Sequence, residues 1–299
     1  MQISAIVSTY NRAEFLKGLF DSVLAQTVSL GQIELIIVNN NSTDKTAEIC
    51  HDFIGKHPEL RTVYCEETRQ GLSYGRNRGI EESNYELITF LDDDAVPAPD
   101  FMEKTISFFE IHPLVNAIGG KILLRYMGEP PDWYNPFLAS LLGYFNPGDR
   151  ERSFRHNYFR GSNMSFRKTL FTKYKPFNPL LGRVGRDLYG NEEKELFYRL
   201  KEAGEPMWYV PSAVVYHLVP PARTETDFVR KQALGTGSSQ RKQARVKGTS
   251  QEWIAVFKEL LKWGITLGLS VIYLLVFKPA VAFMLIRFRF WVSKGMLDK

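Results

Sequence analysis

The fold is limited most strongly by the first 98 residues, in which short apolar runs alternate with amphipathic segments. Apolar runs that predict buried strands occupy residues 3–7, 33–38, 61–65 and 86–91. Apolar residues three and four positions apart predict a helix at 14–26, and further helices are predicted at 46–54 and 72–82. Strands and helices that alternate at this spacing form a parallel sheet with right-handed crossovers. The sequence therefore predicts an α/β fold with helices on both faces of the sheet.

Polar clusters follow three of these strands, at residues 8–12, 39–44 and 92–94. In parallel sheets of this kind, ligands bind outside the carboxyl ends of the strands. We therefore expect the three clusters to meet at one crevice. The glycines between residues 71 and 79 form neither a dinucleotide-binding fingerprint nor a phosphate-binding P-loop.

The last of these clusters consists of three consecutive carboxylates, Asp92, Asp93 and Asp94. Adjacent anions repel one another unless a cation neutralises them, and carboxylate oxygens are preferred ligands of Mg²⁺ and Mn²⁺. Along an extended chain, Asp92 and Asp94 would point to one face and Asp93 to the other. The acids predict a metal site, and the alternative is a solvated turn that caps the next helix.

The second half of the chain is less regular. It predicts a helix at 101–111, an extended segment at 115–124 and a short helix at 167–173. Between them, residues 125–157 form a long loop region rich in proline and aromatic residues, including Trp133. Its aromatic side chains either stack on sugar rings or pack into a small satellite core.

A second acidic pair, Glu192 and Glu193, lies at the start of a helix that ends at Gly204. Acids are favoured there by the helix dipole alone, but a general base would have the same appearance. Short strands follow at 207–210 and 214–217, and the second ends in His217, which is either structural or a ligand.

The composition places the chain among globular proteins, since 44% of its 299 residues are hydrophobic. The net charge is +5, and residues 223–247 hold seven basic residues against two acids. This segment suits a phosphate or an acidic lipid headgroup, or it is a solvated helix face. It lacks the motifs and interleaved aromatic residues of nucleic-acid binding.

Cys50 and Cys65 show neither metal-ligand spacing nor a disulfide framework, which fits a reducing compartment. The N-terminus has no signal-peptide pattern, so we expect the N-terminal domain to be cytoplasmic.

Near the C-terminus, residues 263–286 contain one charged residue, Lys278, which Pro279 follows directly. An apolar segment of about 20 residues suffices to span a bilayer. The Lys-Pro pair divides this one, and basic residues flank both of its ends. We expect a membrane span, a re-entrant hairpin or an interfacial anchor, and the alternative is a buried helix or a dimer face.

Over residues 1–222, a collinear set of motifs closely resembles the family 2 inverting glycosyltransferases with the GT-A fold. The motifs are STYNR, VNNNSTD, the G-x-x-x-G-R-N-x-G of residues 71–79, FLDDDAVP, RGSNMSFR, NEEKEL and VVYH. The resemblance implies a nucleotide-sugar-binding half at 1–98 and an acceptor-binding half at 99–222. A basic linker or helix at 223–252 and a membrane-associated or transmembrane segment at 253–299 would follow.

The resemblance also implies roles for individual residues. Asp94 becomes the metal ligand, with His217 and Asp92 beside it, and Asp92 or Asp93 contacts the ribose or the metal, which is Mn²⁺ or Mg²⁺. The implied donor-binding residues are Thr9, Arg12, Asn40, Asp44, Arg76, Asn77, Asp92 and Asp93. Family members often carry aspartate where this chain has Asn40, which leaves the nucleobase open because an amide both accepts and donates.

On the acceptor side, Glu193 matches the catalytic base, with Glu192 as the other member of the acidic pair. Asn163 matches an acceptor-side position, and Trp133 is a candidate acceptor-binding residue. The implied function is transfer of a sugar from a nucleotide-diphosphate donor to a hydroxyl of a glycan or lipid-linked acceptor. We expect this to serve cell-surface polysaccharide synthesis, with the catalytic domain attached to the inner face of the cell membrane.

Two alternatives carry other functions. Asp92-x-Asp94-x-Val96 also fits the motif of haloacid-dehalogenase-like phosphatases, although that motif normally follows the first strand rather than the fourth. A non-catalytic sugar-binding scaffold with the same fold is the other alternative.

Overall fold

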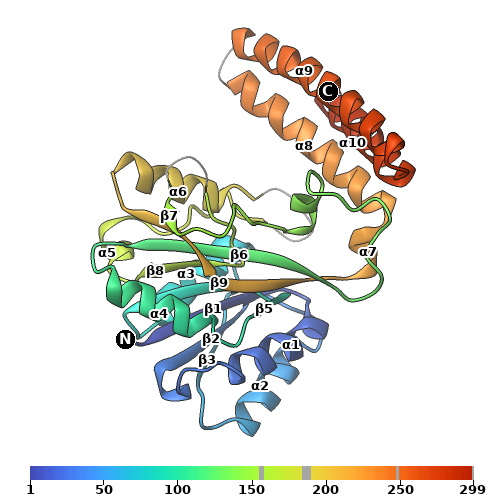
Figure 1. The fold of residues 1–299 in the computed structure, drawn as a ribbon. Coiled ribbons are helices and arrows are strands. Elements are labelled where there is room, and N and C mark those ends of the chain that lie inside the picture. The colour runs from blue at the N-terminus through green and yellow to red at the C-terminus, as the bar shows by residue number, and fades with distance from the viewer. Residues whose placement is uncertain (155–157, 184–189, 247–248, 298–299) are drawn as a thin grey trace. The chain divides into compact units, whose positions relative to one another are not determined.

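The computed structural model describes residues 1–154, 158–183, 190–246 and 249–297. The chain divides into two compact units. The first consists of Met1–Arg125 and Phe145–Leu218, and the second of Tyr126–Tyr144 and Val219–Lys299 (Figure 1).

Within the described residues, nine strands form one mixed sheet in the order β3-β2-β1-β4-β8-β6-β9-β5, with β7 paired to β9. Strands β3, β2, β1 and β4 are parallel, which confirms the predicted parallel core, whereas the pairs β4–β8, β6–β8, β5–β9 and β7–β9 are antiparallel. The strands are β1 Ile3–Thr9, β2 Ile33–Asn39, β3 Arg61–Glu66, β4 Leu87–Asp92, β5 Ala95–Pro97, β6 Ala117–Tyr126, β7 Arg152–Ser153, β8 Met164–Arg167 and β9 Met207–Val219.

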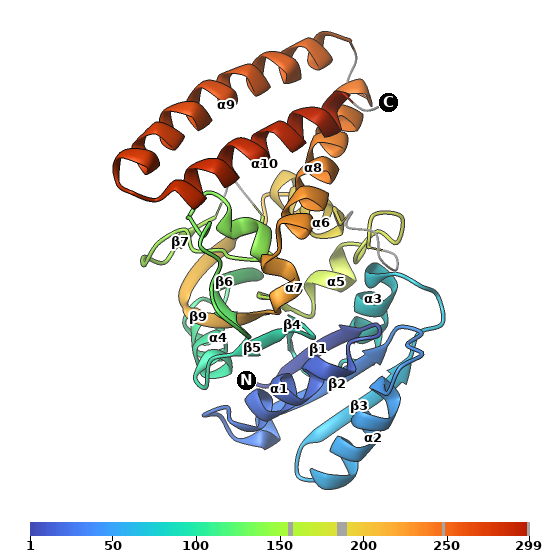
Figure 2. The same cartoon turned by 90° about the vertical axis from the view of Figure 1, so that its right-hand side faces the viewer.

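Helices cover both faces of the sheet, as predicted. Those of the first unit are α1 Ala13–Leu24, α2 Thr46–Lys56, α3 Leu72–Glu82, α4 Phe101–Ile111, α5 Leu170–Lys173 and α6 Glu192–Glu202. One core cluster packs α1, α2 and α4 against alternate residues of β1 such as Ala5 and Val7, and the other packs α3, α5 and α6 on the face of Ile6. Figures 1 and 2 show α1 and α2 beneath the sheet. This alternation of buried residues is the pattern of a strand buried on both faces.

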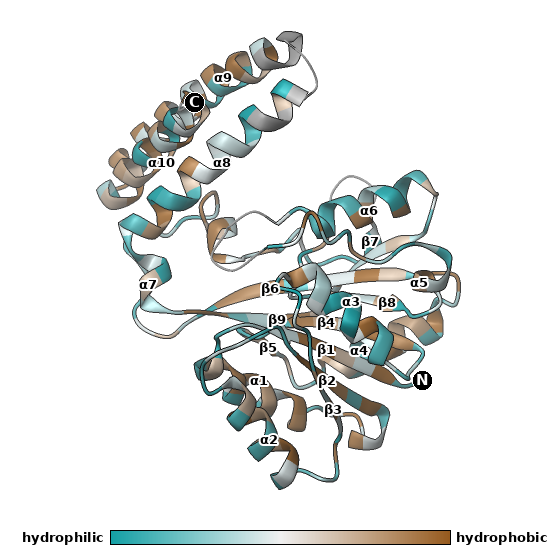
Figure 3. Cartoon of the chain, turned by 180° about the vertical axis from the view of Figure 1, so that it is seen from behind, coloured by the Kyte–Doolittle hydropathy of each residue, from teal (hydrophilic) through white to brown (hydrophobic). Residues whose placement is uncertain are grey.

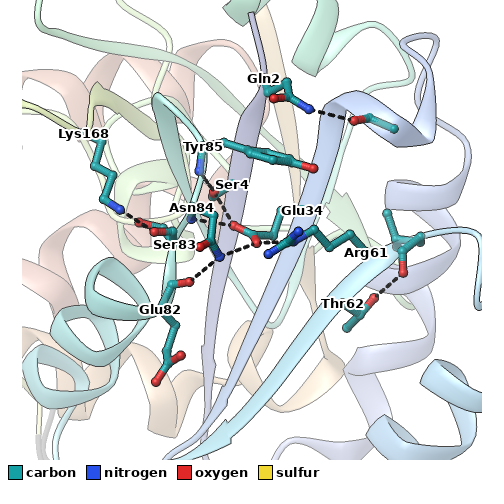
Figure 4. Close-up of polar contacts among 12 residues, drawn as sticks. Gln2, Ser4, Glu34, Arg61, Thr62, Glu82, Ser83, Asn84, Tyr85 and Lys168 are labelled. Carbon is teal, nitrogen blue, oxygen red and sulfur yellow. Dashed lines mark hydrogen bonds and ion pairs between the residues drawn. The ribbon is translucent and has the colours of Figure 1, made fainter.

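At the amino ends of the parallel strands, a buried carboxylate ties neighbouring segments together (Figure 4). Glu34 of β2 accepts hydrogen bonds from Ser4 of β1 (2.7 Å), Arg61 of β3 (2.7 Å) and both the backbone and the side chain of Asn84. Burial alone would raise the pKa of Glu34, but these hydrogen bonds hold it below its usual value.

Two features of the sheet differ from the prediction. The segments at 207–210 and 214–217 are one strand, β9. Pro211 lies between the stretch of β9 that pairs with β7 and the stretch that pairs with β5, so its missing amide hydrogen interrupts neither. The three-residue strand β5 was not predicted, because it is too short for a periodic pattern.

The second unit contains α7 Pro221–Thr224, α8 Thr226–Val246, α9 Thr249–Leu275 and α10 Pro279–Leu297. The break at Lys278-Pro279 appears as predicted, with Pro279 at the first position of α10. In the described part of the chain, no helix combines the length and the apolar composition that crossing a membrane requires. The predicted transmembrane alternative for 253–299 is therefore not supported.

Candidate active site

The three polar clusters meet at the carboxyl ends of β1, β2 and β4, as predicted. Thr9, the last residue of β1, donates a hydrogen bond to Asp93 (3.0 Å), and Arg12 lies 4.0 Å from Asp94. The carboxylate of Asp44 accepts hydrogen bonds from the backbone of Ala13 and of Thr46, which are the first residues of α1 and α2. Asp44 thus fixes the loop after β2 to the first residues of both α1 and α2.

The three acids do not alternate between two faces, because Asp93 and Asp94 form a turn between β4 and β5 rather than extended chain. Their side chains diverge, with Asp92 directed to Arg76, Asp93 to Thr9 and Asp94 to His217. Burial and the neighbouring carboxylate of Asp94 raise the pKa of Asp93 to about 8. The turn therefore concentrates negative charge that a bound cation would relieve.

The predicted metal ligands come together only in part. Nε2 of His217 lies 3.2 Å from Oδ1 of Asp94, and both side chains are buried. Asp92 is instead held by Arg76 at 3.3 Å. Among the described residues, no group of three histidine, cysteine or acidic side chains could hold a metal ion by itself.

Arg76 of α3 lies at the centre of the site and contacts both acidic motifs. Its guanidinium donates to Glu192 (2.9 Å) and to Asp92 (3.3 Å), and it lies 3.2 Å from Glu193. The guanidinium carbon of Arg76 lies 5.4 Å from the ring centre of Phe177.

 The ring of Phe177 therefore packs against the same guanidinium that joins the acids. Gly161 faces this cluster, and a Cβ atom there would lie 2.0 Å from Nη2 of Arg76 and 2.1 Å from Oε1 of Glu193. A glycine is thus required at 161 for the arginine and the glutamate to meet.

The two glutamates at the start of α6 have different environments. Glu192 is buried, and its Oε2 has no hydrogen-bond partner in the part of the chain that the structure describes. The side chain of Glu193 is 20% exposed. Burial and the negative charges of Glu192 and Asp92 raise the pKa of Glu193 to about 7. The positive charge of Arg76 acts in the opposite direction and does not cancel them. Of the two glutamates, Glu193 is the one whose raised pKa allows it to exchange a proton near neutral pH.

Two of the predicted donor-binding residues hold the backbone in place. Asn40 is buried, and its amide donates to the carbonyls of Glu67 (2.9 Å) and Arg69 (2.8 Å) while its oxygen accepts from the amide of Gly71 (2.8 Å). Asn77 forms a hydrogen-bond pair with the backbone of Phe177. An aspartate could not make the two donations of Asn40, which gives the departure from the family pattern a structural reason. Donor binding by these residues stays a prediction.

The two predicted acceptor-binding residues are also engaged within the fold. The side chain of Asn163 bonds to the backbone of Gly120, Lys121 and Ala213, and so links β6 to β9. Trp133 belongs to the second unit, where its buried indole donates to the carbonyl of Thr224 (3.0 Å). Satellite packing therefore accounts for the burial of Trp133, and acceptor binding by either residue stays a prediction.

Sequence reasoning missed two residues of the site, Gly161 and Phe177. Gly161 lies in the RGSNMSFR motif, but only Asn163 of that motif was predicted as a site residue. Phe177 follows a proline in a loop, where the periodicity of apolar residues carries no information.

Comparisons with known proteins agree with this geometry. The family model for glycosyl transferase family 2 matches residues 4–175. A glucosyl-dolichyl phosphate glucuronosyltransferase of Haloferax volcanii is 28% identical over 244 residues, which cover 81% of this chain and 77% of the relative. The Haloferax volcanii glycosyltransferase AglE is 27% identical over 80% of this chain and 73% of the relative.

Solved structures share the fold at low sequence identity. The mannosyltransferase PcManGT from Pyrobaculum calidifontis, in complex with GDP-Man and Mn²⁺, superposes with a TM-score of 0.65 at 17% identity, covering 99% of this chain and 87% of that one. TarS residues 1–349 from S. aureus, in complex with UDP, give a TM-score of 0.54 at 17% identity, covering 79% of this chain and 65% of that one, less than two thirds. These structures have a GT-A fold like that of the first unit, and the phosphatase alternative is not supported. The chain belongs to glycosyl transferase family 2.

Proposed function

We propose that this glycosyltransferase inverts the anomeric centre as it moves a sugar from a nucleotide-diphosphate donor to a hydroxyl of a glycan or lipid-linked acceptor. The observation that carries the proposal is the contact of Arg76 with both acidic motifs. It brings the predicted donor side, at Asp92, next to the predicted base, Glu193. A single displacement needs these two parts on opposite sides of one sugar ring.

The chemistry assigned to Glu193 follows from its environment. An acceptor hydroxyl must lose its proton as it attacks the anomeric carbon, and a carboxylate with a pKa of about 7 is suited to take that proton near neutral pH. The bond that forms joins the acceptor oxygen to the anomeric carbon, and the bond that breaks releases the nucleoside diphosphate. Attack from the side opposite the leaving group inverts the configuration.

The residues of the acidic turn fit a divalent cation. Mg²⁺ and Mn²⁺ are commonly held by one or two carboxylates together with substrate phosphates, so a complete protein cage is not needed. Asp94 and His217, with Asp92 nearby along the chain, would hold the ion. When bound, it supplies positive charge for the departing diphosphate. Mn²⁺ in the PcManGT complex supports this assignment.

The relatives support a choice of substrates. The Haloferax volcanii enzyme is named for a glucosyl-dolichyl phosphate, which supports a lipid-linked acceptor. The inner face of the cell membrane is our proposal for where that acceptor is met. UDP is bound in TarS and GDP-Man in PcManGT, so the neighbours differ in nucleobase. We propose that this chain acts in cell-surface polysaccharide synthesis, with a sugar linked to either UDP or GDP as its donor.

The test is binding of nucleoside diphosphates, including UDP and GDP, with and without Mn²⁺, measured as a shift in melting temperature. A ligand that binds only the native state raises the melting temperature by mass action. We expect one nucleotide to stabilise the wild type in the presence of Mn²⁺ and to lose this effect in Asp94→Ala. Asp52→Ala is the matched control, because Asp52 is exposed and pairs with Lys56 on the surface of α2. If no nucleotide stabilises the folded wild type, the non-catalytic scaffold replaces this proposal.

A further inference from the structure

The hairpin of α9 and α10 has polar side chains on the inside. Glu259, Thr266 and Ser270 of α9 are each no more than 6% exposed. Arg289 of α10 donates to Glu259 at 3.2 Å and to Thr266 at 3.3 Å, and Ser293 donates to Glu259 at 3.1 Å. In a helix that faces water, the apolar stripe normally packs against the neighbouring helix. Here part of the interface between the two helices is polar and internally bonded, as is common for helices whose surroundings are apolar.

Many side chains of α9 outside this interface are apolar and exposed. Figure 3 shows hydrophobic stretches along both α9 and α10. Leu260, Leu267, Val271 and Leu275 are 63%, 50%, 56% and 73% exposed. The other exposed apolar residues of the hairpin include Trp253, Ile254, Val256, Phe257, Leu261, Ile265, Ile272, Leu274, Val276, Phe283 and Phe290. So many exposed apolar side chains on one hairpin mark an interaction site rather than a water-facing surface.

Helix α8 covers a different side of the hairpin. At the crossing of α8 and α10, a Cβ atom on Gly237 would lie 2.0 Å from the carbonyl oxygen of Val292, and one on Gly295 would lie 2.1 Å from that of Leu234. The two glycines therefore let the helix backbones come into close contact. This packing holds α10 against α8 and leaves the apolar side of α9 uncovered by them.

The turn between α9 and α10 presents an aromatic ring. Phe277 is 91% exposed and has a left-handed backbone, with φ of 58°. Its amide donates to the carbonyl of Leu274 and the amide of Lys278 to that of Tyr273, a helix end at which glycine is the usual residue. Phe277 thus keeps a large apolar ring in a left-handed conformation that favours glycine. The exposed ring points to apolar surroundings outside the chain.

The charges identify those surroundings. Residues 253–297 contain six basic residues and one acid, Glu259, which is already paired with Arg289. Lys258, Lys278, Arg287 and Lys294 are exposed on the hairpin. Two copies of the chain packed through this surface would bring their basic residues together, which costs free energy. A bilayer that contains anionic lipids takes up both the apolar side chains and the positive charges.

We propose that the apolar side of the α9–α10 hairpin, with Phe277 at its turn, inserts into the headgroup region of an anionic lipid bilayer. This inference deepens the proposed function and rests on it, because the bilayer that the hairpin binds would be the one that holds the lipid-linked acceptor. The hairpin itself needs no donor, metal or acceptor to bind lipid, so the two proposals can fail separately.

The test is flotation of the full chain with vesicles of phosphatidylcholine and phosphatidylglycerol in equal amounts, against vesicles of phosphatidylcholine alone. We expect the wild type to float with the anionic vesicles. Phe277→Asn should weaken binding about tenfold, because a large apolar side chain is lost, while asparagine tolerates the left-handed backbone and keeps the melting temperature. Leu114→Asn is the matched control, since Leu114 is 82% exposed but lies in the first unit.

The basic residues give a second arm. Lys258→Gln together with Lys278→Gln should weaken binding to anionic vesicles by roughly fivefold for each lysine. Glu193→Gln should float like the wild type even if it transfers no sugar, which separates this inference from the proposed function. Failure of the wild type to float, or flotation of Phe277→Asn at wild-type affinity, would overturn the proposal. A dimer in solution that Phe277→Asn dissociates would also overturn it, since the surface would then bind a second copy.

Discussion

Nη2 of Arg76 lies 3.2 Å from Oε1 of Glu193. The arginine comes from α3 and the glutamate from α6, more than a hundred positions later in the chain. Because the same guanidinium also donates to Asp92, the position of the proposed base is fixed relative to the acidic turn. Arg76 is in this sense a positioning residue, since it acts through the two acids.

Replacing Arg76 by lysine tests that role. A single ammonium group cannot reproduce the planar fork that reaches three carboxylates, so Glu193 should lose its fixed orientation. We expect Arg76→Lys to lower kcat by about a hundredfold. Removing the close guanidinium should also raise the pKa of Glu193 and move the pH dependence of the rate upward. Arg78→Lys on the same helix, whose arginine pairs with Glu82 at the surface, should have wild-type kinetics.

The pH dependence of the wild type follows from the pKa of Glu193. The base must be deprotonated to accept a proton, and its pKa is about 7. We expect kcat/KM to fall by about tenfold for each pH unit below 7 and to level off above it. The measurement is the initial rate of sugar transfer across this range. A rate that stays constant down to pH 5 would show that Glu193 is not the base.

Gly161→Ala should remove activity through the same contact. The new methyl group would lie about 2 Å from both Arg76 and Glu193 and force them apart. We expect transfer to fall by about a hundredfold or more while the donor still binds. Gly55→Ala is the control, because a Cβ atom at this position of α2 meets nothing within 4 Å. Equal activity of the two variants would contradict the requirement for the Arg76–Glu193 contact.

Asn40→Asp, which restores the residue that the family often carries, should destabilise this chain. A carboxylate cannot donate to the carbonyls of Glu67 and Arg69, so two buried acceptors would face an anion. We expect the free energy of unfolding to fall by about 2–5 kcal/mol, as measured by urea denaturation. Asn41→Asp is the matched control, since Asn41 is exposed and its side-chain amide donates to the side chain of Gln70. A variant as stable as the wild type would show that the loop does not depend on these donations.

Much of the fold could be predicted from local patterns. The bounds of α3 and α4 agree with the prediction, and each helix has a definite beginning, after Gly71 or Asp100. The parallel core followed from apolar runs that are buried on both faces. The antiparallel half was predicted only in part: the sequence indicated β6 and the two pieces of β9, but β5, β7 and β8 are two to four residues long and too short for a periodic pattern.

The sequence predicted which residues form the candidate site better than it predicted which of them contact one another. The sequence placed acids at the ends of β4 and at the start of α6, where the structure has them. It did not indicate that Arg76 joins them, because this contact depends on how two distant helices pack. It also did not indicate that Asn40, Asn77 and Asn163 bond to backbone groups, since an amide that binds a ligand has the same appearance in a sequence.

The most direct measurement is the rate of sugar transfer by Glu193→Gln, with a donor chosen by the nucleotide panel and a lipid-linked sugar as acceptor. The amide keeps the shape of the side chain but cannot take a proton, so kcat should fall by about 10²–10⁴-fold with little change in donor affinity. Glu195→Gln is the control, because Glu195 pairs with Arg199 on the outer side of α6. Transfer by Glu193→Gln at the rate of this control would contradict the assignment of Glu193 as the base.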